Sequence, residues 1–186
     1  MKKVLKFAGI ALLAVLIAAA LYVGYVFGTY SRIEDNQMLS VTHGSGGVET
    51  AAADTEYRVL SWNIGFGAYE DDFGFFMDGG TESRAWSKER VIANIDEIGQ
   101  TIEEAKPDIS ILQEVDFDSD RSYHVDEALA LRTYEDLDAW SDSVLAVNYH
   151  SAYLFYPITQ PHGASNSGLL TTSRLGIRSA VRRSLP

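Results

Sequence analysis

The chain opens with an uninterrupted apolar run and continues with shorter segments in which apolar residues alternate or recur at helical spacing. From Phe7 to Ser31 no residue is charged, and this run is long enough to cross a hydrocarbon core of ~30 Å as a helix. A globular helix of that length would show a polar stripe on its solvent side. The pattern therefore predicts a single membrane-spanning helix and not a buried core helix.

Charges on either side of the run predict its orientation. Lys2, Lys3 and Lys6 precede it, whereas Glu34 and Asp35 soon follow it. Positive charge near a membrane span stays on the cytoplasmic side. We therefore expect the N-terminus in the cytoplasm and the remaining chain outside, as a single-pass membrane protein.

The alternative is a cleaved signal peptide, with Ala18–Ala20 as its small-residue cleavage site. The apolar run continues past that point through Leu21–Phe27, and a cleaved peptide does not need this continuation. An uncleaved anchor is the favoured interpretation.

A linker is expected after the anchor, at residues 32–55. It contains Gly44–Gly47 and Ala51–Ala53 and lacks a sustained apolar period, which is typical of a tether. We expect residues 1–31 to form the cytoplasmic lysines and the anchor, and residues 56–186 to form the folded domain, which begins near Glu56.

Two strands flank one amphipathic helix at the start of this domain. Tyr57–Gly65 and Pro107–Asp116 are rich in strand-forming residues. Between them, residues 86–105 carry apolar side chains at three- and four-residue steps, with Ser87 as N-cap and Pro107 as stop. This face is formed by Val91, Ile95, Ile98 and Ile102.

The second half of the domain predicts one more helix and two more strands. The helix is expected from Val125 to Trp140, with further turns to about Val147, and the strands at residues 151–158 and 168–173. Strand, helix and strand in this order indicate packed α and β layers.

Composition and charge narrow the function classes. The chain has 186 residues, enough for one domain, and no cysteine, which excludes disulfides, thiolate metal sites and a cysteine nucleophile. The formal net charge of −11 excludes a diffuse basic attraction to nucleic acid. A polyanionic substrate would have to be met locally, most simply through a bound divalent cation.

The candidate chemistry lies at the ends of the first two strands, which present Asn63 and Glu114. Asn63 could simply cap a strand-to-loop turn, and Glu114 could be a buried carboxylate paired with an arginine. Since charges are almost never buried unpaired, the two residues together favour a chemical role.

The loop after Glu114 has the spacing of a calcium loop. Asp116, Asp118 and Asp120 fall at positions one, three and five, and Glu127 falls at position twelve. However, Arg121 occupies the position that requires glycine, and a strand precedes the loop instead of a helix. The calcium-loop interpretation is therefore the weaker one.

Other polar candidates carry little weight. The run Glu70–Asp72 could hold a cation, but such runs are more often solvated turns. His124, His150 and His162 are scattered singly, and no pair has metal-ligand spacing. Neither a nucleophile elbow nor a phosphate-cradling glycine loop before a helix is present in the sequence.

Three motifs together resemble the endonuclease/exonuclease/phosphatase family. They are Ser61–Ile64 (SWNI), Asp108–Asp116 (DISILQEVD) and Ser167–Arg174 (SGLLTTSR). The family includes DNase I-like nucleases, exonuclease III-like repair enzymes, inositol polyphosphate 5-phosphatases and neutral sphingomyelinases. The resemblance covers roughly residues 57–177 and implies an α/β class, a two-sheet α/β sandwich (DNase I-like) with helices outside.

The resemblance also implies a metal site. Asn63 matches the family's first-strand asparagine, which helps to hold the metal and the water-activating group, and Glu114 matches the Mg²⁺-ligating glutamate; Mn²⁺ could substitute. Physical chemistry agrees, since Mg²⁺ prefers oxygen ligands and is often held by one or two carboxylates with phosphate and water. Catalytic and metal-binding roles are thus expected for Asn63 and Glu114, whereas substrate-binding residues are unknown.

One departure from the family pattern is large. The family takes an Asp-x-Asn pair and a terminal Asp-His pair from later strands, but this sequence ends at Pro186. His162 precedes the last matched strand and takes no role. We therefore expect an incomplete sandwich, the N-terminal part of the domain, without turnover and poorly folded outside the anchor.

The sequence thus predicts part of a membrane-anchored, exported, Mg²⁺-dependent phosphoesterase. Its substrate would be a nucleic acid, a phospholipid or an inositol phosphate, its other partner is the membrane, and no protein partner is indicated. The alternative is a non-catalytic surface binding module derived from the same fold.

Overall fold

The computed structural model describes residues 2–45, 49–134 and 142–184. The chain divides into two compact units, Met1–Arg32 and Ile33–Pro186. The first unit is helix α1, Lys2–Thr29, none of whose residues is buried. Its length and apolar composition are those of a membrane span or of a signal sequence, so the predicted apolar helix is confirmed.

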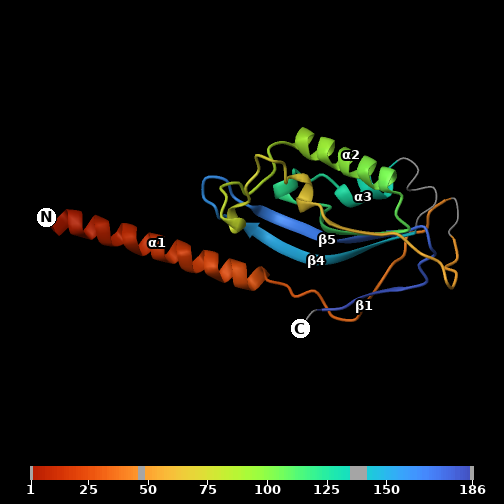
Figure 1. Cartoon of the computed structure of the whole chain (residues 1–186). Helices are drawn as coiled ribbons and strands as arrows, with labels where there is room; N and C mark the ends of the chain where they lie inside the picture. Colours follow the sequence, from red (N-terminus) through yellow and green to blue (C-terminus); the bar gives the residue numbers. More distant parts are fainter. Residues whose placement is uncertain (1, 46–48, 135–141, 185–186) are drawn as a thin grey trace. The chain divides into compact units, whose positions relative to one another are not determined.

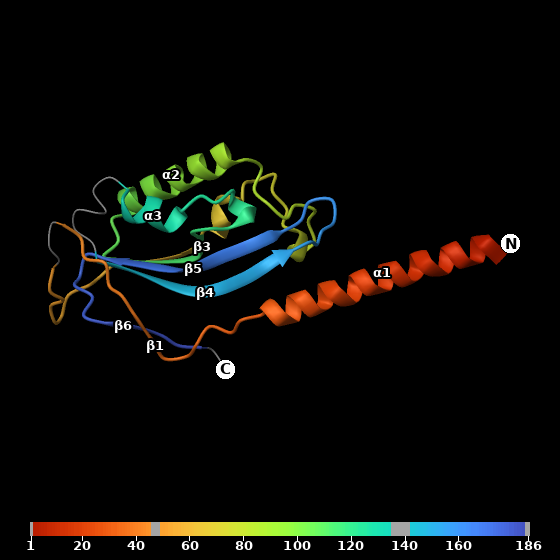
Figure 2. The ribbon, with the colours of Figure 1, turned by 180° about the vertical axis from the view of Figure 1, so that it is seen from behind.

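The second unit is an α/β fold with two sheets (Figures 1 and 2). The larger sheet has the order β2-β3-β5-β4, with β2 and β3 parallel and the other pairs antiparallel. A two-stranded sheet pairs β1 with β6. The predicted fold class, an α/β chain with two sheets after an apolar helix, is confirmed. The strands are β1 Gln37–Leu39, β2 Val59–Asn63, β3 Ile109–Asp116, β4 Asp142–Leu154, β5 Gly163–Ser173 and β6 Ala180–Arg182.

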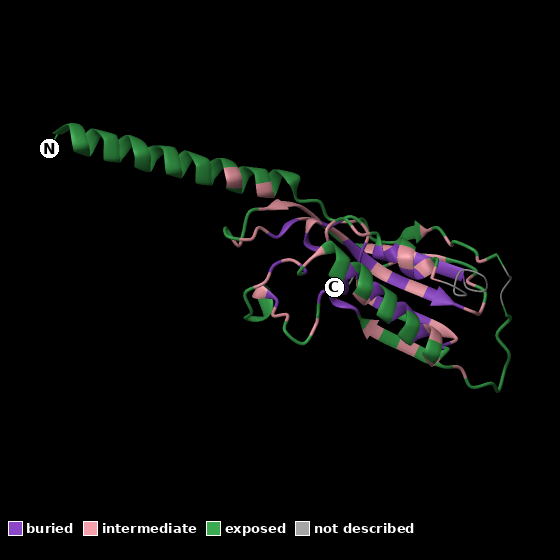
Figure 3. Ribbon diagram, turned by 90° about the horizontal axis from the view of Figure 1, so that it is seen from above, coloured by how far each residue is buried: buried purple, intermediate pink, exposed green. Residues whose placement is uncertain are grey.

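Helices cover one face of the larger sheet. They are α2 Lys88–Ala105 and α3 Glu127–Arg132, with short 3-10 turns η1 Gly65–Gly67, η2 Phe76–Asp78 and η3 Asp120–Ser122. The apolar face predicted for α2 is buried, together with Leu112, Val115 and Leu170 from the sheet (Figure 3). The hydroxyl of Ser87 accepts the Arg90 amide at 3.2 Å, so the predicted N-cap is confirmed.

The β1–β6 ribbon runs along the opposite face of the larger sheet, away from α2 and α3 (Figures 1 and 2). It covers this face only in part, since Ile111 stays 36% exposed and Val59 56% exposed. A cavity of about 340 Å³ remains between ribbon and sheet, bounded by Leu39, Val144 and Val181 among others. The sheet is therefore well packed on its helical face and loosely packed on the other.

The segment expected to be a linker belongs to the folded unit. Strand β1 lies within it, and Thr42 and Ser143 exchange two backbone hydrogen bonds of 2.9 and 2.8 Å. The Arg182 guanidinium donates to the carbonyl of Ile33 at 3.2 Å. On the side of this segment the contacts use main-chain groups, which composition does not reveal. They place the start of the compact unit at Ile33 instead of Glu56.

The predicted second helix is shorter than expected. Helix α3 ends at Arg132, residues 135–141 lie outside the described part, and the expected turns to Val147 are wrong. From Asp142 the chain is strand β4, paired with β5 through ten residues. Pairing across the sheet overrides the local helical pattern. Strand β4 begins and ends earlier than the strand predicted at residues 151–158, whereas β5 begins earlier than the strand predicted at residues 168–173 and ends at Ser173 as predicted.

Candidate functional site

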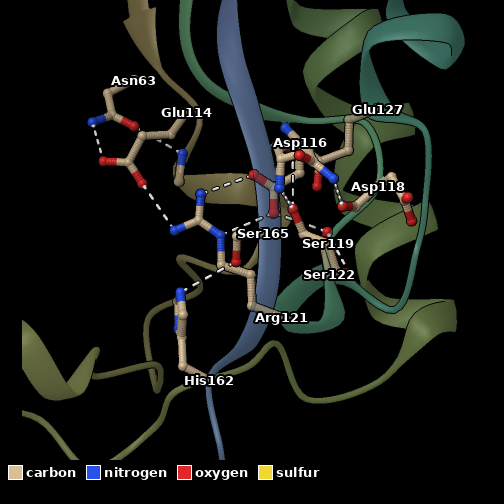
Figure 4. A network of polar contacts seen from close by, with 12 residues as sticks. Asn63, Glu114, Asp116, Asp118, Ser119, Arg121, Ser122, Glu127, His162 and Ser165 are labelled. Atoms are coloured by element: carbon tan, nitrogen blue, oxygen red, sulfur yellow. Dashed lines mark hydrogen bonds and ion pairs between the residues drawn. The ribbon is translucent and has the colours of Figure 1, made fainter. Parts of the chain in front are cut away.

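Asn63 and Glu114 lie side by side at the carboxyl ends of two neighbouring parallel strands. Asn63 pairs with Gln113 in the sheet register, and its Nδ2 donates to Glu114 Oε1 at 2.9 Å (Figure 4). The amide of Gly65 donates to Asn63 Oδ1 at 2.9 Å, which fixes which end of the carboxamide faces the carboxylate. The structure thus brings both predicted residues together.

The backbone at Glu114 turns its carboxylate outward. A register irregularity separates Leu112 from Val115 on the β3–β5 ladder, and Glu114 has a left-handed φ of +54°. Bulges re-aim a side chain beside functional sites, and left-handed backbone at a non-glycine residue costs energy. The Glu114 side chain is 40% exposed, so the carboxylate is open to a ligand.

Arg121 stands beside this pair but is bound elsewhere. One guanidinium nitrogen lies 4.0 Å from Glu114 Oε2, whereas two others donate to both carboxylate oxygens of Asp116 at 2.8 and 2.9 Å. The guanidinium also stacks 4.0 Å from the ring centre of Phe66. The arginine's main partner is therefore Asp116; Glu114 is not buried, but it forms a longer ion pair with the same arginine.

Asp116 is the centre of a buried cluster that the sequence did not predict. It is fully buried and also accepts the Ser122 hydroxyl at 2.9 Å, while its own amide donates to Glu127 Oε2 at 2.9 Å. Burial, and then the negative charge of Asp116, raise the pKa of Glu127 well above its usual value. We name Asp116, Arg121, Ser122 and Glu127 the inner cluster; a lone arginine within an acidic loop was its only sequence signal.

The calcium-loop alternative finds no support in the described residues. Asp118 binds His124 at 2.6 Å, and Asp120 accepts the amide of Ala164 at 2.7 Å. Asp116 and Glu127 belong to the inner cluster. Within residues 2–45, 49–134 and 142–184, no group of three acidic, histidine or cysteine residues could hold a metal ion.

The run predicted at Glu70–Asp72 is also engaged. Glu70 is paired with Arg90 and accepts from Asn94 at 2.8 Å, and Asp72 accepts the indole of Trp86 at 3.2 Å. Glu70, Arg90 and Asn94 lie along a cavity of about 620 Å³ that Asn63 also lines. Asn63 therefore borders a groove along α2.

His162 lies behind the site and packs as a core residue. It is buried, with Nε2 3.2 Å from the hydroxyl of Ser165 and Nδ1 3.3 Å from the carbonyl of Ser83. Burial, followed by the nearby charge of Arg121, lowers the pKa of His162. Its ring supports the fold beside Arg121 (Figure 4).

Comparison with known proteins gives a match in structure. No family model matches the chain, and no curated protein matches it. The chain is similar to a crystal structure described as an endonuclease/exonuclease/phosphatase from Beutenbergia cavernae DSM 12333, with 21% sequence identity and a TM-score of 0.38. The match covers 63% of this chain and 26% of that chain, so this chain corresponds to about a quarter of its length. The description names the family that the sequence motifs resemble.

Proposed function

We propose that this chain forms part of a membrane-anchored, exported, Mg²⁺-dependent phosphoesterase, with Glu114 as a metal-binding carboxylate. One observation carries the proposal. The carboxamide of Asn63 holds one oxygen of Glu114 at 2.9 Å, and the side chain is 40% exposed on a left-handed backbone. An exposed carboxylate held in a strained orientation is typical of a ligand-binding position.

The donor set fits a magnesium ion better than a calcium ion. Mg²⁺ is commonly held by one or two carboxylates and keeps several waters, whereas Ca²⁺ takes six to eight oxygen ligands. Glu114 offers one carboxylate. Its second oxygen, Oε2, lies 4.0 Å from a guanidinium nitrogen of Arg121. Asn63 would orient Glu114 instead of binding the metal directly, because its oxygen accepts the Gly65 amide and its nitrogen faces Glu114.

The chain's own residues supply positioning. When bound, a divalent cation neutralises charge on a phosphate oxygen and lowers the pKa of a coordinated water. Asn63 and the bulge at Glu114 fix the carboxylate before a ligand arrives. With a net charge of −11, a metal is the simplest means by which this surface would accept an anionic ester.

The proposal is tested by titrating the full chain in detergent with Mn²⁺, a spectroscopic substitute for Mg²⁺, and following free Mn²⁺ by electron paramagnetic resonance. We expect one site, competed by Mg²⁺, whose affinity falls at least tenfold in Glu114→Gln. Glu104→Gln, an exposed glutamate near the end of α2, is the matched control and should bind as the parent does.

Unchanged affinity in Glu114→Gln would overturn the metal assignment and leave the non-catalytic binding module as the better interpretation.

A further inference from the structure

The loop between β4 and β5 exposes a cluster of large apolar side chains. In this hairpin loop, residues 155–162, Phe155 is 54% exposed, Tyr156 66% and Ile158 87%. Adjacent exposed apolar residues on one loop are unusual on a soluble surface and mark an interaction site. None of residues 153–163 is an acid, a lysine or an arginine.

The hairpin loop lies at the same end of the sheet as Glu114. Strand β3 ends with Asp116 paired to Ser167 of β5, and β5 begins only four residues earlier, at Gly163. The amide of Ala164 reaches Asp120 in the loop that follows β3. A flat partner that contacts the hairpin loop would therefore face the end of the sheet that carries the candidate site.

The chain also enters the domain from this end. Gln37 of β1 pairs with Arg182, whose Nε donates to the carbonyl of Val147 midway along β4 at 2.9 Å. Farther along the chain, Thr42 pairs with Ser143 near the start of β4, at the end away from the hairpin loop. Followed backward from Gln37, the chain thus runs toward the loop end of the sheet.

The connection between helix α1 and the domain is short. Helix α1 ends at Thr29 and the domain unit begins at Ile33, so residues 30–32 alone separate them. Extended chain covers at most ~3.6 Å per residue, so this connection spans no more than roughly 14 Å. If α1 stays in a bilayer, the domain remains at the bilayer surface.

We propose that the hairpin loop docks on a lipid bilayer surface through Phe155, Tyr156 and Ile158. Aromatic rings favour the membrane interface, and a loop without cationic side chains suits an uncharged, zwitterionic surface better than an anionic one. Docking turns the site end of the sheet toward the lipid. This further inference rests on the proposed phosphoesterase function: the substrate of the protein is a phosphoester at the membrane surface and not a polymer away from it.

The test uses the absence of cysteine in the chain. Ile158→Cys is labelled with bimane, and the full chain is reconstituted into phosphatidylcholine vesicles containing nitroxide-labelled phosphatidylcholine. Ile92→Cys, on an exposed isoleucine of α2 with 52% exposure, is the matched control. We expect at least twofold stronger quenching at position 158 than at position 92.

Equal quenching at the two positions would overturn the docking proposal. In the Ile158→Cys background, the double substitution Phe155→Ser and Tyr156→Ser should lower quenching to the level of position 92. If the strong quenching at position 158 persisted, the short connection alone would bring the loop near lipid, and the docking proposal would be wrong. Added phosphatidylglycerol should not strengthen quenching, and a salt-sensitive increase would contradict apolar docking. Because neither metal nor phosphoester is used, failure here leaves the Glu114 assignment intact, and failure of Mn²⁺ binding leaves the docking surface intact.

Discussion

Two carboxylates that stand two residues apart on β3 have opposite surroundings. Asp116 is fully buried and receives hydrogen bonds from Arg121 and Ser122, whereas Glu114 is 40% exposed and receives one from Asn63. The irregularity between Leu112 and Val115 causes this difference, because it interrupts the strand's regular alternation. The comparison teaches that the buried carboxylate of Asp116 stabilises the fold. The exposed carboxylate of Glu114 remains available to a ligand.

The largest expected effect is the loss of stability when Asp116 loses the arginine that pairs with it. Arg121→Met leaves Asp116 buried without its cation, and breaking a buried pair in this way costs about 3–5 kcal/mol. Chemical unfolding of the full chain in detergent measures the loss. Arg90→Met, which breaks the partly exposed pair with Glu70, should cost no more than about 1 kcal/mol; similar losses in both variants would break the comparison.

A pH effect follows from the inner cluster. The pKa of Glu127 is raised in the folded protein, first by burial and then by Asp116, while an unfolded glutamate titrates near ~4.3. Between these two values the folded state holds a proton that the unfolded state has released, so the free energy of unfolding falls as the pH rises. Glu127→Gln keeps an acceptor for the Asp116 amide and removes this decrease.

Melting temperatures of the parent and Glu127→Gln, measured from pH 4 upward, test this prediction. The variant should gain stability relative to the parent as the pH rises through that window. Parallel curves would show that Glu127 is ionised in the folded chain. His162 has the opposite effect on the pH dependence of stability. Because its pKa is lowered in the folded protein, the free energy of unfolding decreases as the pH falls below ~6.5. This contribution is the same in the parent and in Glu127→Gln.

The smallest expected effect concerns the backbone at Glu114. Glu114→Ala and Glu114→Gly both remove the carboxylate, but only glycine adopts φ of +54° without strain. The glycine variant should be more stable than the alanine variant by about 1 kcal/mol, and both should lose Mn²⁺ affinity. Equal unfolding free energies would show that position 114 relaxes once its side chain is gone.

The sequence predicted the parts of the fold that local chemistry determines. Ser87 caps α2 as its side chain requires, and β2 and β3 lie where apolar runs end in Asn63 and Glu114. The meeting of these two residues follows from the geometry of neighbouring parallel strands. The expected role of these two residues came from the family resemblance of the motifs, not from spacing.

Pairing between distant segments could not be read in the same way. Asp142–Leu154 is a strand because β5 lies beside it, and Gln37–Leu39 is a strand because β6 does. The inner cluster depends on the path of the loop after β3, which folds Arg121 back over Phe66. Such contacts depend on tertiary geometry, and neither composition nor periodicity carries that information.

The β1–β6 ribbon also has a consequence for synthesis. Leu39 pairs with Ala180, so the first strand of the domain must wait for a partner made about 140 residues later. At roughly 5–20 residues per second, that delay lasts about 7–28 s. Throughout it, β1 has an unpaired edge directly after the apolar helix. The order of assembly is therefore expected to be apolar helix first, helical face next and ribbon last.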